Sequence, residues 1–301
     1  MTEPMPALSI VAMPGRRRRT IELCQEAERR GFSGIYSPSP MGNLSMCEAL
    51  AWQTGKIAFA TSIVPIYQRT MVDFTQSAAM MHEVSGGRFS LGIGIAHGPS
   101  YVRMGVTPGK PLADTRAFIQ KFRAETSFGP LPPIIVAALR KKMVALAGEL
   151  AEGVVFANVC RSHMAESLSG LPAAKRKDGF FIGNMIPTCI SDDVAAAKEV
   201  NRRTLTRYAS LPNYRNYWKE AGYVEEMTAI EKALAEGRGD DVPKYLTDKW
   251  LADNTLFGPA ARVREGVAAW RAAGVHTPIL VPTSASGNQM TAIDEMFAAF
   301  S

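Results

Sequence analysis

The chain has 301 residues, of which 47% are hydrophobic and 21% are charged. This composition indicates a folded globular protein with a large core and excludes an intrinsically disordered chain. The formal net charge is +6, and the run Arg16–Arg19 contributes four of the positive charges. Because no aromatic residues interrupt this run, we interpret it as a solvated helix face rather than a nucleic-acid site. The alternative is a positive rim that attracts an anionic cofactor or substrate.

The cysteines are widely spaced and form no CxxC pair; they are Cys24, Cys47, Cys160 and Cys189. We therefore expect neither a zinc site nor a disulfide framework, and we predict reduced, mostly buried thiols. No apolar run follows a basic N-terminal region, and no uncharged apolar stretch reaches about 18 residues. The pattern predicts a cytoplasmic protein without membrane contact.

The first half of the chain predicts four units, each a strand followed by a helix. The strands are expected at 8–13, 34–36, 57–64 and 89–95, and the helices at 20–30, 44–54, 71–84 and 112–123. The strands are short apolar runs, whereas the helices show apolar residues at helical spacing. Gly31 closes the first helix, as glycine commonly does at a C-cap.

The second half predicts four more units. Strands are expected at 134–137, 153–157, 180–189 and 277–281, and helices at 141–150, from Met164, at 194–208 and at 290–300. The stretch 207–257 is too long for one connection and has helical patterns at 224–235 and near 246–252. We interpret it as a helical insertion between strands seven and eight that forms a lid, a substrate wall or a subunit interface.

Eight apolar strands separated by helices favour a parallel sheet that closes on itself. The sequence thus predicts an α/β fold, a (β/α)8 TIM barrel, as one domain over 1–301. An open doubly wound sheet is the alternative, but the first turn, Ala12–Gly15, has no GxGxxG pattern and precedes four arginines.

The residues expected at the carboxyl ends of the strands include few carboxylates. Glycosidases of this fold need paired carboxylates, and metal-dependent hydrolases need clustered His and Asp ligands. The four histidines, His82, His97, His163 and His276, show neither HxH nor HExxH spacing, so we expect no metal site. A planar cofactor that carries the chemistry fits this pattern better.

The segment Gln68–Gly94, with SGGRF before a strand ending in LGIG, resembles the signature of the luciferase-like monooxygenase superfamily. Stretches at 31–36, 133–159 and 258–275 are similar to further parts of that family, in order. The resemblance implies a bacterial luciferase-like barrel and a flavin- or deazaflavin-dependent oxidoreductase. Ile95–Pro99, Gly109–Pro111 and Leu211–Tyr223 resemble its coenzyme F420-dependent branch, which implies F420 as cofactor, with FMN as the alternative.

The resemblance also implies positions for the cofactor. The family places a non-proline cis peptide at the end of strand three, where it supports one face of the ring; Ser62 and Ile63 match it. The loop Ala137, Ala138, Leu139 and Arg140 matches the cofactor-tail loop. The remaining candidates are Ser37, Gly92, Gly94, His97, Asn158, Lys141 and Arg161. Gly92 and Gly94 are expected to give clearance to a flat ring, and the cations to bind a phosphate. Barrel lining or a solvated loop is the alternative at these positions.

His97 is the only histidine expected at a strand end, so it is the candidate catalytic proton donor or acceptor; a structural role is the alternative. Many family members end strand two on an acidic residue followed by His, whereas this chain has the run Tyr36–Pro40. The resemblance therefore leaves three hypotheses: an F420-dependent oxidoreductase that transfers a hydride to or from a small organic substrate, an FMN-dependent monooxygenase, and a non-catalytic deazaflavin-binding barrel. It also allows a homodimer.

Overall fold

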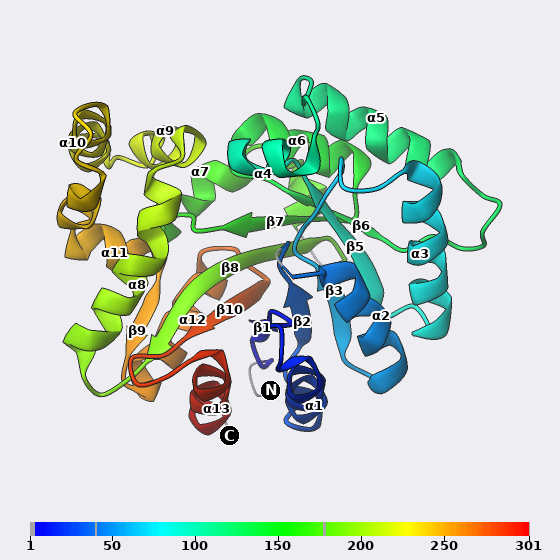
Figure 1. Ribbon diagram of the computed structural model, residues 1–301, viewed down its shortest axis with the longest axis horizontal. Coiled ribbons are helices and arrows are strands. Elements are labelled where there is room, and N and C mark those ends of the chain that lie inside the picture. The colour runs from blue at the N-terminus through cyan, green and yellow to red at the C-terminus, as the bar shows by residue number, and fades with distance from the viewer. Residues whose placement is uncertain (1–3, 40, 177–178, 301) are drawn as a thin grey trace.

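The computed structural model describes residues 4–39, 41–176 and 179–300. Eight parallel strands form a closed barrel at its centre (Figure 1). In order around the barrel they are β1 (Ala7–Ser9), β2 (Gly34–Ser37), β3 (Ala58–Thr61), β5 (Phe89–Gly94), β6 (Ile134–Ala137), β7 (Gly153–Ala157), β8 (Phe181–Ile190) and β10 (Thr277–Thr283). Strand β10 pairs with both β8 and β1, which closes the ring. The predicted (β/α)8 TIM barrel is confirmed.

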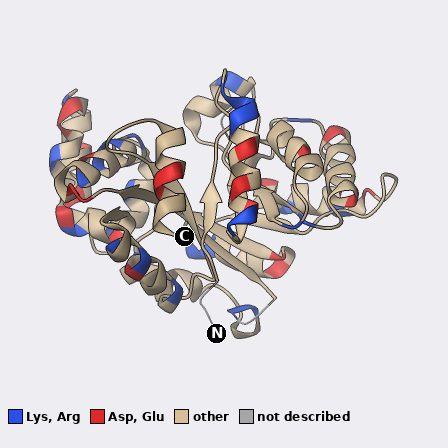
Figure 2. Cartoon of the chain, turned by 90° about the horizontal axis from the view of Figure 1, so that it is seen from below, with Lys and Arg blue, Asp and Glu red and all other residues tan. Residues whose placement is uncertain are grey.

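Helices surround the barrel and cover the outer face of its strands. They are α1 (Arg17–Arg29), α2 (Asn43–Gln53), α3 (Met71–Val84), α5 (Pro111–Ala124), α6 (Lys141–Leu150), α7 (Met164–Leu168), α8 (Val194–Ala209), α12 (Ala260–Ala272) and α13 (Gln289–Ala299). Figure 2 shows the charged residues on these helices and on the loops. The described strands contain no charged residue, as expected for a sheet buried on both faces.

Several predicted elements match the observed bounds, including α3, α6, β6 and β7. The first strand ends at Ser9, before the predicted Met13. The third predicted strand is divided into β3 and β4 (Val64–Pro65), between which the Ser62–Ile63 peptide is cis, as the resemblance implied. The predictions did not include α4 (Gly98–Met104), α9 (Pro212–Glu220) or β9 (Leu256–Gly258).

Arg88 of the SGGRF signature forms hydrogen bonds to α2, to the segment before β3 and to the residue that ends α3. Its guanidinium donates hydrogen bonds to the carbonyl oxygens of Ala51 and Thr54 at the end of α2 and to that of Ile57 before β3. It also bonds the Thr54 hydroxyl and the Ser85 carbonyl. The last carbonyls of a helix lack intrahelical partners, so Arg88 caps α2 and ties it to the start of β5. This part of the signature therefore has a structural role.

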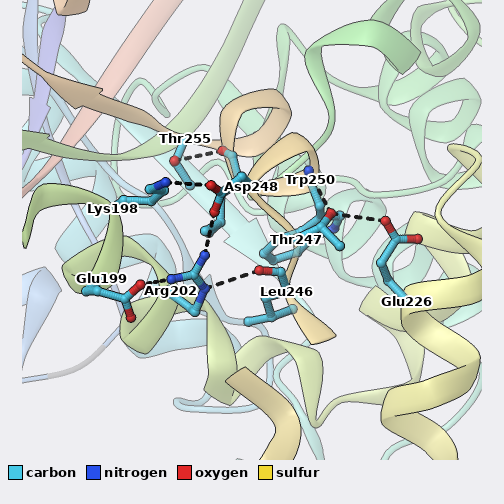
Figure 3. A network of polar contacts seen from close by, with 10 residues as sticks. Lys198, Glu199, Arg202, Glu226, Leu246, Thr247, Asp248, Trp250 and Thr255 are labelled. Atoms are coloured by element: carbon cyan, nitrogen blue, oxygen red, sulfur yellow. Dashed lines mark hydrogen bonds and ion pairs between the residues drawn. The ribbon is translucent and has the colours of Figure 1, made fainter. Parts of the chain in front are cut away.

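The connection between β8 and β10 contains α8, α9, α10 (Val224–Ala235), α11 (Asp248–Asn254), β9 and α12. Polar contacts bind its helices to one another (Figure 3). The Asp248 carboxylate accepts hydrogen bonds from Lys198 at 2.5 Å and from Arg202 at 2.7 Å, both on α8. Next to it, the Thr247 hydroxyl donates to Glu226 of α10 at 3.1 Å. Helices α10 and α11 are thus anchored on α8.

All four cysteines are buried and free, which confirms the prediction for them. Residues 16–19 are exposed at the beginning of α1, as a solvated run would be. Within the described ranges, none of the helices has the length and apolar character needed to cross a membrane.

Candidate active site

Two contacts across the barrel fill its interior. Tyr36 of β2 stacks on Phe181 of β8, with ring centroids 5.4 Å apart. The Ser62 hydroxyl donates to the Met185 sulfur at 3.0 Å. Because β3 and β8 are four strands apart in a ring of eight, the Ser62–Met185 contact spans the barrel. Ser62 directly follows β3, so the contact lies at the carboxyl end of that strand, the end at which active sites of this fold lie.

Small apolar residues form a floor next to this contact. Ile63, Gly94 and Ala137 lie side by side: a Cβ atom at Gly94 would lie 3.0 Å from the Ile63 side chain and 3.1 Å from the Ala137 methyl. Ile63, Ala137 and Ala157 lie at or just past the carboxyl ends of β3, β6 and β7 and are half-buried, so part of each is accessible at this end of the barrel. A low, uncharged surface of this kind fits one face of a planar ring system. We call Ile63, Gly94 and Ala137 the floor.

Gly92 has a different role from Gly94. A Cβ atom at Gly92 would lie 1.8 Å from the carbonyl oxygen of Thr61. The Thr61 hydroxyl also donates to the Gly92 carbonyl at 2.7 Å. The close approach of β3 and β5 therefore requires glycine at this position, and the prediction that Gly92 gives clearance to a cofactor is wrong.

His97 lies three residues beyond β5, at the N-cap of α4. It is half-buried, and its ring centroid lies 5.7 Å from that of Tyr214 on α9. Burial lowers the pKa of His97 below its usual value of 6.5. The imidazole is therefore neutral near pH 7 and able to accept a proton.

Asn158 follows β7 and holds α9 against the barrel end. Its backbone has a left-handed φ of 56°. Its N–H donates to the Met185 carbonyl at 3.2 Å, and its carbonyl accepts from the Trp218 indole at 3.1 Å. Its side chain hydrogen-bonds Tyr214. Asn158 is only 4% exposed, so these contacts within the protein surround it.

Buried hydrogen bonds connect the loop after β7 to residues of the insertion between β8 and β10. The Cys160 N–H donates to the Tyr217 hydroxyl at 3.1 Å. The Asp253 carboxylate accepts from the Ser162 N–H at 2.9 Å, from the Ser162 hydroxyl at 2.6 Å and from the Tyr223 hydroxyl at 2.9 Å. Three donors satisfy this buried carboxylate without a cation. These contacts hold α9, α11 and the residue before α10 against the loop after β7.

Two of the predicted phosphate-binding cations already have carboxylate partners, and the third lines a separate cavity. Arg140 pairs with Glu220 of α9, and Lys141 pairs with Glu166 of α7. Arg161 lines a cavity of about 280 Å³ between the loop after β7, β9 and α12. The carboxylate partners already neutralise Arg140 and Lys141, and Arg161 belongs to a different hollow.

The loop after β6 contains the other predicted tail residues. The N–H of Ala138 donates to the Val155 carbonyl of β7 at 3.0 Å, so this donor is not available to a bound molecule. Ala138 is buried, whereas Leu139 is half-buried and Arg140 is exposed. Of this loop, Leu139 and Arg140 are the residues that a bound molecule can reach.

The turn after β2, which lacks the acidic residue that the resemblance led us to look for, is hydrogen-bonded to the end of β3. The carbonyl of Ser37 accepts the Ser62 N–H at 2.6 Å. The Ser37 hydroxyl is buried and has no hydrogen-bond partner among the described residues. The Ser39 hydroxyl donates to the Ile63 carbonyl at 2.7 Å. Ser37 thus contacts the end of β3 through its backbone carbonyl, and its hydroxyl takes no part in this contact.

Three residues of this region had no predicted role: Met185, Tyr214 and Asn43. Tyr214 had a sequence signal, because Tyr214 and Trp218 are four residues apart and so share one face of a helix. Met185 and Asn43 had none, since their contacts come from segments distant in the sequence. Within the described ranges, no group of three His, Cys, Asp or Glu residues could hold a metal ion.

The comparisons with known proteins agree with this geometry. A family model described as luciferase-like monooxygenase matches residues 5–277. The chain belongs to this family. As a luciferase-like protein it is an oxidoreductase, and the resemblance seen in its sequence is confirmed.

Individual relatives extend along nearly the whole luciferase-like chain. A protein of Mycobacterium tuberculosis, provisionally named a coenzyme F420-dependent oxidoreductase, is 27% identical and the match covers 89% of this chain and 91% of the relative. The coenzyme F420-dependent tetrahydromethanopterin reductase of Methanopyrus kandleri superposes with a TM-score of 0.78 at 16% identity, over 98% of this chain and 97% of the other. An F420-dependent secondary alcohol dehydrogenase superposes with a TM-score of 0.71 at 13% identity, over 99% and 98%. These two structures show the shared fold.

Proposed function

We propose that the chain is a coenzyme F420-dependent oxidoreductase that transfers a hydride between the deazaflavin and a small organic substrate at the carboxyl end of the barrel. The observation that carries this proposal is the uncharged floor of Ile63, Gly94 and Ala137 at the strand ends, together with the neutral His97 three residues after Gly94. The name of the Mycobacterium tuberculosis relative favours F420 over FMN.

The residues present fit such a cofactor. The floor would support one face of the ring, and the Ser62–Met185 contact crosses the barrel next to it. When bound, F420 supplies a carbon that accepts or donates a hydride. Leu139 and Arg140 would hold the tail of the cofactor, and the tail would then replace Glu220 as the partner of Arg140. We leave Arg161 out of this tail site because it lines a separate cavity, and we assign Asn158 to holding α9.

His97 would move the proton of the reaction. As a substrate alcohol gives up its hydride from carbon, the unprotonated imidazole accepts the hydroxyl proton, which leaves a neutral carbonyl product. In the reverse direction the protonated imidazole returns that proton to the oxygen. Ser37 and Ser39 cannot take this role because a serine hydroxyl does not exchange protons near neutral pH. In this proposal His97 takes the role of the acidic residue and histidine that many members have after strand two.

Fluorescence titrations of the purified protein with F420 and with FMN test the cofactor assignment. We expect saturable binding of F420 and weaker binding of FMN; a clear preference for FMN would instead support the monooxygenase hypothesis. Steady-state reduction of F420 by a panel of small alcohols, or the reverse reaction with carbonyl compounds, tests turnover. Turnover with any member contradicts the non-catalytic hypothesis.

Paired histidine variants test the proton-transfer role. His97→Asn should bind F420 with nearly unchanged affinity but lose about 100-fold in kcat, in the range observed for general acid–base catalysis. His276→Asn is the matched control, because His276 is exposed at the opposite end of the barrel, just before β10, where its ring contacts the Phe180 carbonyl. Equal kcat values for the two variants would exclude His97 from the reaction.

A further inference from the structure

The carbonyl oxygen of Ile63 is held by side chains. Strand β2 ends at Ser37, so no β2 backbone N–H extends as far as Ile63. Instead the Ser39 hydroxyl donates to the Ile63 carbonyl at 2.7 Å and the Asn43 amide donates to it at 3.0 Å. A carbonyl oxygen has two lone pairs, and here two side chains occupy both.

Asn43 joins three elements at this point. It is 1% exposed at the first residue of α2. Its amide nitrogen donates to the carbonyls of Ser37 and Ile63, at 3.4 and 3.0 Å, and its oxygen accepts the Leu44 N–H at 3.0 Å. Every part of this buried amide is therefore used, which links the end of β2, the end of β3 and the start of α2.

The other neighbours of Ile63 are fixed as well. Pro65 pairs with Gly94, and the Ile66 N–H donates to the Gly94 carbonyl at 3.0 Å. Ser62, the residue before Ile63, donates its N–H to the Ser37 carbonyl at 2.6 Å. The chain is thus held on both sides of Ile63, and the Ile63 carbonyl depends on Ser39 and Asn43.

We propose that Ser39 and Asn43 are positioning residues that fix Ile63, and with it the floor against which the cofactor ring lies. This inference rests on the proposed function, because it takes the floor to be the ring-binding surface. It gives the turn after β2 a role in this chain: where other members have an acid and a histidine, this turn braces the floor. Loosening a supporting residue of a binding site weakens binding even where the residue touches no ligand.

Ser39→Ala is the principal test. Ser39 is only half-buried and its hydroxyl donates one hydrogen bond, to the Ile63 carbonyl, so the variant should fold. We expect about a three- to tenfold weaker affinity for F420, which corresponds to the loss of one hydrogen bond, and a nearly unchanged melting temperature. Ser39→Thr keeps the hydroxyl and should restore the affinity. Ser45→Ala is the matched control, since Ser45 is exposed on α2 and its hydroxyl makes no hydrogen bond to any residue that the structure describes.

A second measurement needs no cofactor. The δ1-methyl NMR signal of Ile63 in the cofactor-free protein should shift and report greater mobility in Ser39→Ala and in Asn43→Asp, which removes the amide donor. It should not change in Ser45→Ala. An unchanged methyl signal in both variants would overturn the inference, whatever the enzyme binds.

The outcomes separate the inference from the proposed function. If the wild-type protein binds F420 but Ser39→Ala and Asn43→Asp bind it equally well, the positioning role is refuted while the proposed function stands. If the wild-type protein binds neither F420 nor FMN, the proposed function fails, and the Ile63 methyl signal of the two variants alone decides whether Ser39 and Asn43 fix Ile63. Weaker binding by both variants, rescue by Ser39→Thr and a mobile Ile63 methyl together support the inference.

Discussion

Gly92 and Gly94 lie two residues apart on β5, but replacing them with alanine should affect different properties. Gly92→Ala should mainly lower stability, and Gly94→Ala should mainly weaken cofactor binding. In Gly92→Ala the new methyl carbon would lie 1.8 Å from the Thr61 oxygen, whereas real Cβ atoms do not come closer than 3.0 Å. Strands β3 and β5 would have to separate by at least about 1.2 Å, a large displacement for a close-packed interior. The hydrogen bond from the Thr61 hydroxyl to the Gly92 carbonyl would be lost as well.

The cost of Gly92→Ala combines overpacking with that lost bond. Overpacking costs roughly 1–3 kcal/mol and a hydrogen bond contributes about 1 kcal/mol, so we expect a loss of about 3 kcal/mol. At about 2–4 °C per kcal/mol, the melting temperature should fall by roughly 6–12 °C. In Gly94→Ala the methyl would contact the side chains of Ile63 and Ala137 at 3.0–3.1 Å, which small movements relieve. Its melting temperature should fall by less than about 4 °C.

Cofactor affinity should show a different pattern, because Gly94→Ala raises the floor. We expect F420 to bind at least about tenfold more weakly to Gly94→Ala, a change of about 1.4 kcal/mol. Thermal unfolding followed by circular dichroism and F420 fluorescence titration measure the two effects. A Gly92→Ala protein as stable as the wild type would refute the strand-spacing argument. A Gly94→Ala protein with unchanged F420 affinity would show that the ring does not lie on the floor.

Three further predictions concern stability, pH and charge. Arg88→Met should cost about 3 kcal/mol in chemical denaturation, because it uncaps α2 and removes charged donors from several carbonyls; a loss under about 1 kcal/mol would contradict this role. Burial lowers the pKa of His97, so as the pH falls below about 6.5 the unfolded chain binds a proton before the folded chain does and stability decreases. Calorimetry should therefore find a smaller loss of stability between pH 7 and pH 5 in His97→Gln than in the wild type, and equal losses would argue against the lowered pKa. Glu220→Gln releases Arg140 from an exposed ion pair, so the melting temperature should change by less than about 2 °C while F420 affinity rises about two- to threefold at low salt. An unchanged affinity at every salt concentration would separate Arg140 from the cofactor tail.

The element pattern could be predicted because it depends on local sequence. The alternation of short apolar runs with helical periodicity placed α3, α6, β6 and β7 at their observed bounds, and the repeat of eight such units predicted closure of the sheet. SGGRF and the stretches around it pointed to the luciferase-like family, which the family model confirms over residues 5–277. Each of these signals lies within one stretch of chain.

The roles of individual residues depended on contacts between distant stretches. Gly92 and Gly94 look alike in the sequence and, two residues apart on one strand, point to the same face. They differ because Gly92 lies against the Thr61 carbonyl, whereas Gly94 lies between the side chains of Ile63 and Ala137.

Ser39 and Asn43 likewise showed no pattern that leads to Ile63, twenty or more residues away, and Tyr214 reaches His97 only through the folding back of α9. The sequence by itself determined the barrel and the family and predicted a site at the strand ends. The tertiary structure decided which side chains lie together at those ends and which are paired elsewhere, since packing and hydrogen bonding between segments remote in the chain fix these contacts.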